Sequence, residues 1–579
     1  MAIRLSKTRQ QEAIELVKKR YASALNFQRP LFVRFNEYYR MYRAIRDDTK
    51  HNYAGRAKLF IPYIFATIET IIPRLIGSKP TINAVPREPS DIENADINSS
   101  LFHYNWDIMN MKRKIKIWVK QALIYGTSIA KIYWQFEEDK YDQPNVDILD
   151  VFDFFVDPDA TNMEDAQYVI QRAERNYDYL AKNDNYKLPK ELAFKIQQDE
   201  YKVQRDAILG LSKPNDKDSK KVEILEYWGN FDINGDGINE ECLLVIADKE
   251  YLIRAELNPY EHGKKPFIRL VDIEIPSSFW GIGEVEQLSS LQYELNDVRN
   301  QRMDNVTLIL NRMWKVDKNA DVDEQDLISQ AGQIIHTGRM DGIEPLITPD
   351  VTTSAYNEET LIKADIQLVS GVTDYTQGQG NKSMAGGGGL ANNTATGIML
   401  LQEAGNQRFK YKLDNIEDAL IDLGEQLLAL NQQFLDKEMK LRIVGEGRTR
   451  WIEMNPDNLK GNFDIAVEAG STQPMNKSVR RAEARELLQA VIPFAQLGID
   501  IKYFIKYLLK TYELTDIDQA FPQEIAQQGG VMGGQAAGLP AGVPPANNIA
   551  NPGAAAIAGL AGSQGVNQQA NIVANARTG

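Results

Sequence analysis

The residues with the clearest chemical potential lie in the string DINGDGINEE, at positions 232–241. Asp232, Asn234 and Asp236 place oxygen-bearing side chains at alternate positions ahead of a glycine, as in the first half of a calcium-binding loop. The match then ends, because the chain has leucine where such a loop needs a bidentate Glu. Asn-Gly and Asp-Gly pairs also favour the turn of a β-hairpin. Two interpretations stay open: a divalent-cation site, or a bare turn in a hairpin spanning residues 223–256.

A second candidate is the Gly-rich segment 376–394, which contains Lys382 followed by Ser383. A nucleotide-binding P-loop needs Gly-Lys-Ser directly after a strand. Here Asn381 separates the lysine from the preceding glycine, and the residues ahead of the segment have helical spacing. We therefore expect no ATP site in this segment.

Cofactor chemistry of other kinds lacks ligands in this sequence. Cys242 is the single cysteine, and the four histidines lie far apart, which excludes a disulfide framework and a Cys/His zinc site. Apart from the possible divalent cation at residues 232–241, we expect no cofactor and no enzymatic activity.

Composition limits the partners. The chain has 579 residues, 43% of them hydrophobic, and a formal net charge of −14, so it is folded and has more than one substructure. The apolar run at 61–77 is interrupted by Glu69 and Arg74 and falls short of the roughly 20 residues that span a membrane. We expect a cytosolic protein with no membrane contact. Negative charge opposes tight coating of DNA, although it permits DNA to slide past.

The middle of the chain indicates the architecture. Apolar residues recur at three- and four-residue spacing from Gly281 to Leu310, which predicts one long helix with a narrow apolar stripe, typical of a helix packed against other helices. Strand-like runs follow at 313–316 and 333–336, and helical spacing returns at 357–372. The pattern predicts an outgoing helix, a small module at its tip and a returning helix.

A further helix follows the Gly-rich segment, because apolar residues from Phe409 to Phe434 alternate spacings of four and three. Arg408, Lys410 and Lys412 on its early turns are expected on a solvated face. Beyond it we expect strands and then helices, and the last residues, with a single charge at Arg577, are expected to be disordered or dependent on assembly.

This order of parts resembles the portal (head-to-tail connector) proteins of tailed bacteriophages, most closely the P22-like portals of short-tailed phages. No string that carries the resemblance is a catalytic signature, but four of them in this order are specific together. The resemblance covers roughly residues 50–520, and the C-terminal tail departs from the P22 pattern of a long helical barrel. The four strings are GRAKLFIPYIFATIETIIPRL (55–75), FFVDPDAT (154–161), YWGNFDINGDGINEE (227–241) and PSSFWGIGEVEQLSSLQYELNDVRNQRMDNV (276–306).

The resemblance implies an α+β, mainly helical portal fold in a ring-forming protomer. By position, its parts are the N-terminal part of a wing (1–275, with the hairpin 223–256), an outgoing stem helix (276–312), a small α/β clip (313–355), a returning stem helix (356–375), a flexible tunnel loop (376–394), a long wing helix (395–437), wing strands (438–470), a helical crown (471–524) and a low-complexity tail (525–579).

The implied function is a conduit for DNA packaging and ejection, formed by a ring, usually of twelve copies, at one capsid vertex of a virion assembled in the host bacterial cytoplasm. The implied partners are other copies of the chain, non-specifically bound double-stranded DNA, the terminase large subunit, head-completion or tail adaptor proteins, and major capsid and scaffolding proteins. The nearest alternative is a head-tail adaptor or minor capsid protein, and a DNA-packaging enzyme is less expected.

The resemblance also indicates which residues would contact DNA and which would pack against neighbouring subunits. DNA phosphates would meet the tunnel loop and the helix behind it, through Asn381, Lys382, Arg408 and Lys410. Neighbouring subunits would pack through the apolar stripe of the outgoing stem helix, with charged flanks pairing between copies. The residues expected in that contact are Val285, Leu288, Leu291, Leu295, Val298, Arg299 and Arg302.

Overall fold

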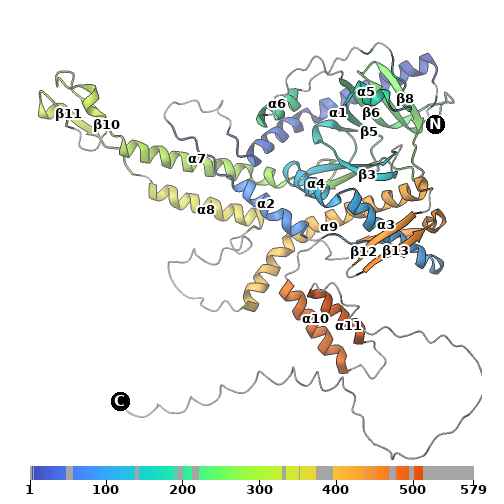
Figure 1. The fold of residues 1–579 in the computed structure, drawn as a ribbon. Helices are drawn as coiled ribbons and strands as arrows, with labels where there is room; N and C mark the ends of the chain where they lie inside the picture. The colour runs from blue at the N-terminus through green and yellow to red at the C-terminus, as the bar shows by residue number, and fades with distance from the viewer. Residues whose placement is uncertain are drawn as a thin grey trace, which may run out of the picture. The chain divides into compact units, whose positions relative to one another are not determined.

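The computed structural model describes residues 3 and 5–512, apart from 47–55, 78, 137–141, 190–191, 193–199, 211–220, 329–333, 351, 373–394, 437–438, 446–447, 468–476 and 494–500. The predicted loop 376–394 and the predicted tail 525–579 lie outside the described residues. Helices and sheets are both present in the described part (Figure 1), as expected for an α+β fold.

Within the described residues, the N-terminal part contains four helices of more than ten residues. α1 buries positions at three- and four-residue spacing, including Ala13, Val17 and Phe32, so one of its faces packs on the rest of the chain. The hydroxyl of Ser6 accepts a hydrogen bond from the backbone N–H of Arg9 at 3.3 Å and caps the start of α1. In the described ranges, no helix is long and apolar enough to cross a membrane. The four helices are α1 (Lys7–Tyr42), α2 (Tyr63–Leu75), α3 (Ile92–Ile108) and α4 (Met111–Tyr125).

Two antiparallel sheets follow. The larger has the order β4-β5-β6-β7-β8, and the smaller has the order β3-β2-β9. The bounds are β2 (Thr127–Gln135), β3 (Gln143–Ile148), β4 (Phe154–Val156), β5 (Tyr168–Asn176), β6 (Lys221–Phe231), β7 (Glu240–Ala247), β8 (Tyr251–Leu257) and β9 (Phe267–Val271), with the short helices α5 (Tyr177–Ala181) and α6 (Glu200–Ile208) between β5 and β6.

Aromatic side chains join α1 to the sheets. Phe152, Phe154 and Phe155 are fully buried. The ring centres of Phe32 on α1 and Phe152 are 5.2 Å apart. Each buried phenyl ring contributes about 2 kcal/mol of transfer free energy. The aromatic part of the string FFVDPDAT therefore belongs to the core, ahead of the turn that leads to β5.

The outgoing and returning helices are α7 (Glu284–Leu310) and α8 (Thr352–Ser370), which lie side by side (Figure 1). Between them, β10 (Met313–Val316) pairs antiparallel with β11 (Ile343–Leu346). The strand expected at 333–336 is therefore misplaced, because residues 334–336 are not in a strand and the partner of β10 lies ten residues further along.

The C-terminal described part centres on α9 (Ala395–Phe434), which contacts β9 and β14. The remaining elements are β1 (Ile82–Pro86), which pairs with β14 (Phe463–Val467), the hairpin of β12 (Met439–Gly445) and β13 (Arg448–Met454), and the helices α10 (Lys477–Val491) and α11 (Ile501–Thr511). Short 3-10 helices span Pro89–Asp91, Val151–Asp153, Glu324–Leu327, Met340–Gly342 and Pro456–Leu459.

Candidate assembly site at the α7–α8 helix pair

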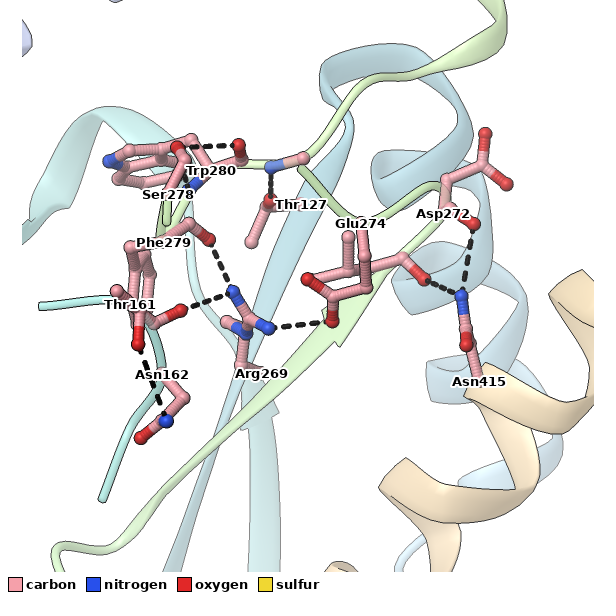
Figure 2. Close-up of polar contacts among 12 residues, drawn as sticks. Thr127, Thr161, Asn162, Arg269, Asp272, Glu274, Ser278, Phe279, Trp280 and Asn415 are labelled. Atoms are coloured by element: carbon pink, nitrogen blue, oxygen red, sulfur yellow. Dashed lines mark hydrogen bonds and ion pairs between the residues drawn. The ribbon is translucent and has the colours of Figure 1, made fainter. Parts of the chain in front are cut away.

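The connection from β9 into α7 is fixed by polar contacts (Figure 2). The guanidinium of Arg269 donates to the carbonyl oxygens of Phe279 at 2.7 Å and Thr161 at 3.0 Å, and pairs with Glu274 at 2.6 Å. The backbone N–H of Gly281 donates to the hydroxyl of Thr127 at 2.8 Å. These contacts set the position from which α7 starts.

Glycines make the same junction tight. Gly126 ends α4 with φ of +87°, in the left-handed region that favours glycine. A Cβ on Gly126 would overlap the carbonyl group of Gly281, and a Cβ on Gly283 would lie 2.7 Å from the carbonyl oxygen of Leu123. The end of α4 and the start of α7 therefore touch through backbone atoms, which explains the glycines in the string PSSFWGIGE.

A buried charge cluster joins α7 to α9. The ammonium of Lys412 on α9 pairs with Glu284, at the first position of α7, at 2.9 Å, and with Asp272, which follows β9. The side chains of Asp272 and Glu284 are 2% and 3% exposed. Lys412 is thus part of the interior, which corrects the expectation of a solvated face.

Two carboxylates share one ammonium in this cluster, and this imbalance affects protonation. Burial raises the pKa of Asp272 to about 7, although Lys412 opposes the change, and Glu284 adds to it. Burial lowers the pKa of Lys412, but Asp272 and Glu284 outweigh that effect and the net shift is upward. Lys412 therefore stays charged at neutral pH, and burial favours the protonated form of Asp272.

Asp272→Asn is expected to change how stability depends on pH. Because the pKa of Asp272 is raised from 3.8 to about 7 on folding, the folded state holds a proton that the unfolded state has lost between these values. The stability that this group contributes is complete below the lower value and is lost as pH rises through the upper one. The melting temperature of the variant, relative to wild type, should increase from about pH 5 to about pH 8.

Differential scanning fluorimetry at both pH values measures this difference. Glu250→Gln is the control, because Glu250 is an exposed carboxylate in the turn between β7 and β8. An equal pH response of the two variants would contradict the assignment of the proton to Asp272.

A ladder of side chains from α7 holds the segment 57–64. The backbone N–H groups of Ala57, Leu59 and Ile61 donate to side-chain oxygens of α7 at 2.6, 2.7 and 3.0 Å, and that of Ile64 donates at 3.3 Å. The accepting residues, in the same order, are Asp304, Asn300, Asn296 and Gln292, which are four residues apart on one side of α7. Sequence analysis missed this site, although the four-residue spacing of amide and carboxylate side chains was visible.

The second partner of α7 is α8. The buried positions of α8 are Glu359, Ile362, Ile366 and Ser370, which share one side of the helix at three- and four-residue spacing. This side of α8 packs against α7.

A single carboxylate anchors that contact. Glu359, with a side chain 5% exposed, pairs with Arg302 at 2.7 Å, Arg299 at 3.0 Å and Lys363 at 2.7 Å. The side chain of Arg302 is itself 4% exposed, and its guanidinium carbon lies 3.9 Å from the centre of the Tyr356 ring. Because buried cations are costly without a partner, we expect Glu359 to stabilise the contact between α7 and α8.

The residues expected between subunits lie largely within the chain itself. Val285, Leu288 and Leu295 are 0% exposed, and Leu291 and Val298 are partly buried against the same core. Arg299 and Arg302 pair with Glu359 of their own chain. In this structure, the apolar stripe of α7 and the two arginines therefore make their contacts inside one protomer.

The string DINGDGINEE forms the turn between β6 and β7, with Phe231 opposite Glu240. The carboxylate of Asp232 accepts hydrogen bonds from the backbone N–H groups of Gly235 at 2.6 Å and Gly237 at 3.0 Å, and pairs with Arg9 at 2.9 Å. The amide of Asn234 donates to the carboxylates of Asp236 and Glu240. Across the residues that the structure describes, no group of three or more His, Cys, Asp or Glu side chains is arranged to hold a metal ion.

Family comparison decides between the interpretations of the whole chain. Residues 137–528, more than half of the 579 residues, match the family model of the phage SU10 portal protein. The chain belongs to the phage SU10 portal protein family. Residues 18–233 also match the family model of the phage P22-like portal protein. The resemblance to portal proteins is thereby confirmed, and the SU10 model covers the larger share of the chain.

Portal proteins are structural proteins of the capsid vertex, and this portal protein serves as the ring for DNA packaging and ejection. Of its expected DNA contacts, Lys410 is exposed on α9. Arg408 belongs to α9, but its side chain lies outside the described residues, and Asn381 and Lys382 lie outside them altogether.

Proposed function

We propose that twelve copies of this portal protein close into a ring in which α8 of each copy contacts the next. The observation that carries the proposal is the side of α8 that faces away from α7. Leu361 is 60% exposed and Leu368 is 67% exposed, whereas Ile362 and Ile366 are buried. The two leucines are seven positions apart in the sequence, so they lie on one side of the helix.

A helix that is apolar on two opposite sides is typical of one packed between two partners. α7 of the same chain covers the first side of α8. Exposed leucines are costly in water, so the second side is suited to a neighbouring copy. We therefore assign the subunit contact to Leu361 and Leu368, in place of the buried stripe of α7.

A ring repeats a head-to-tail contact, so the surface that receives α8 differs from α8 itself. α7 offers such a surface: Met303 is 36% exposed and Leu310 is 68% exposed. These two residues are also seven apart on one side of their helix. Leu361 and Leu368 of one copy would pack against Met303 and Leu310 of the next.

The remaining assignments follow the portal architecture. α7 and α8 would form the stem, residues 313–355 the clip, α9 the long wing helix, and α10 with α11 the crown. DNA would pass without sequence-specific contact, meeting Asn381, Lys382, Arg408 and Lys410. The proposed partners are the terminase large subunit, head-completion or tail adaptor proteins, and the major capsid and scaffolding proteins.

We propose that the protein works without enzymatic activity or a cofactor and that residues 232–241 act as a hairpin turn. The support is that Asp232 is already bound by Arg9 and two backbone N–H groups. A divalent cation would have to displace the guanidinium of Arg9 from that carboxylate.

Native mass spectrometry of the purified full chain tests the copy number. We expect one dominant species at about twelve times the protomer mass of 65.5 kDa. A dominant species at another multiple would overturn the number twelve, and a monomer at all protein concentrations would overturn the ring.

A further inference from the structure

A cavity of about 530 Å³ lies beside α9, between this helix, β9 and the residues 162–164. Figure 2 shows three of the lining residues: Arg269 pairs with Glu274, and the side-chain amide of Asn415 donates to the carbonyl oxygens of Val271 and Asp272. Among the contacts described above, the Arg269–Glu274 pair belongs to its lining, and the other charges of the cavity call for a separate explanation.

Carboxylates outnumber cations in the lining. Each of the three basic residues that line the cavity is held in an ion pair: Lys264 with Glu425 at 2.9 Å, Lys265 with Glu241 at 2.9 Å and Arg269 with Glu274 at 2.6 Å. Glu164, Asp418 and Asp422 also line the cavity and take no part in these three pairs. The cavity therefore has an excess of negative charge.

A second observation, independent of the carboxylates, is an unpaired hydrogen-bond acceptor on a lining residue. Gln426 lines the cavity and is 5% exposed. Its side-chain carbonyl oxygen is buried and has no hydrogen-bond partner within the described residues. A buried oxygen of this kind costs about 1–3 kcal/mol if it stays unsatisfied. The unpaired acceptor and the excess of carboxylates both favour a nearby group that carries positive charge.

The raised pKa of Asp422 also reflects the negative charge of the lining. Burial raises the pKa of Asp422, Lys264 opposes the change, and Glu425, Glu164 and Asp418 add to it. The carboxylates thus disfavour one another's charge. An ammonium group placed among them would reverse that effect.

The chain itself presents a matching basic face on α4. Its helix buries Ile115, Trp118 and Val119, which leaves Lys112, Arg113 and Lys116 exposed. Ile117 on the same helix is 48% exposed. The face therefore combines ammonium donors with an aliphatic side chain, and the cavity also includes apolar lining from Met163 and Val271.

We infer that the cavity beside α9 receives the basic face of α4 from the next copy in the ring, with Lys112 and Lys116 meeting Glu164 and Asp418. This inference rests on the proposed ring. An acidic surface and a basic surface on different elements of one chain are complementary in a head-to-tail contact. Such a contact would fix the relative position of two neighbouring copies through charge, in addition to the apolar contact of α8.

A charge swap tests the inference on the full chain. The acid-side variant is Glu164→Lys with Asp418→Lys, and the base-side variant is Lys112→Glu with Lys116→Glu; all four positions are exposed. Mass photometry measures the fraction of protein in rings at low salt. The ring fraction of each variant should be at least about tenfold lower than that of wild type, because like charges then face each other across the contact.

Combining all four substitutions should restore the ring fraction to within about twofold of wild type, because opposite charges again face each other. The control combines Glu250→Lys and Lys318→Glu, two exposed positions outside both surfaces, and should form rings like wild type. Circular dichroism checks that every variant is folded.

The outcomes separate this inference from the ring itself. Absence of rings in wild type would overturn the proposed ring. Rings in wild type, together with normal rings in both reversed variants or no rescue in the folded combined variant, would overturn the α4–cavity contact while leaving the ring in place.

Discussion

Replacing Leu361 and Leu368 by Asp is expected to abolish ring formation and leave the protomer folded. Both side chains are exposed in the chain, at 60% and 67%, so the substitutions remove little of the intramolecular core. In the ring they would place two carboxylates in an apolar contact, where burying an unpaired charge is costly. The ring fraction measured by mass photometry should fall at least about tenfold, because few residues dominate such contacts.

Two comparisons sharpen this test. Ile238→Asp changes an aliphatic residue of similar exposure, 66%, in the β6–β7 turn, and should form rings normally. Leu295→Asp changes a residue that is 0% exposed, so it should lower the melting temperature of the protomer itself. If the double variant at Leu361 and Leu368 forms rings like wild type, α8 does not provide the subunit contact.

The second large effect is expected from Glu359→Gln. The amide keeps the size of the side chain but leaves Arg302, which is 4% exposed, without its counter-charge. Removing one partner of a buried ion pair costs about 3–5 kcal/mol. α8 should therefore open more often, and hydrogen exchange of backbone amides in residues 352–370 should be at least about tenfold faster.

Glu358→Gln is the matched control, because Glu358 is the exposed neighbour of Glu359 on the same helix. Its amide exchange should equal that of wild type. Equal exchange in both variants would show that the pairs of Glu359 with Arg299 and Arg302 do not hold α8 on α7.

The helices of this region could be predicted well from the sequence. The spacing of apolar residues placed α7 from Gly281 and α8 at 357–372, close to the observed Glu284–Leu310 and Thr352–Ser370. The strand β11, which pairs with β10 between the two helices, could not be placed in the same way. Four-residue strands have little periodicity, and β11 is selected by its pairing with β10.

The contacts of the helices were harder to foresee. The narrow stripe of α7 correctly indicated packing, but amphipathicity does not say whether the partner is the same chain or another one. Asn296 and Asn300 look like residues of a solvated face, because the segment that they hold lies more than 230 residues earlier. Lys412 was misjudged for the same reason, since its two carboxylates come from distant parts of the chain.

Negative-stain electron microscopy of the purified full chain, after size-exclusion chromatography, tests the central claim most directly. Class averages viewed along the particle axis should show closed rings with a central opening and about twelve lobes, because a head-to-tail contact whose rotation closes generates a ring. Monodisperse single protomers, without ring-shaped views at any protein concentration, would contradict the account.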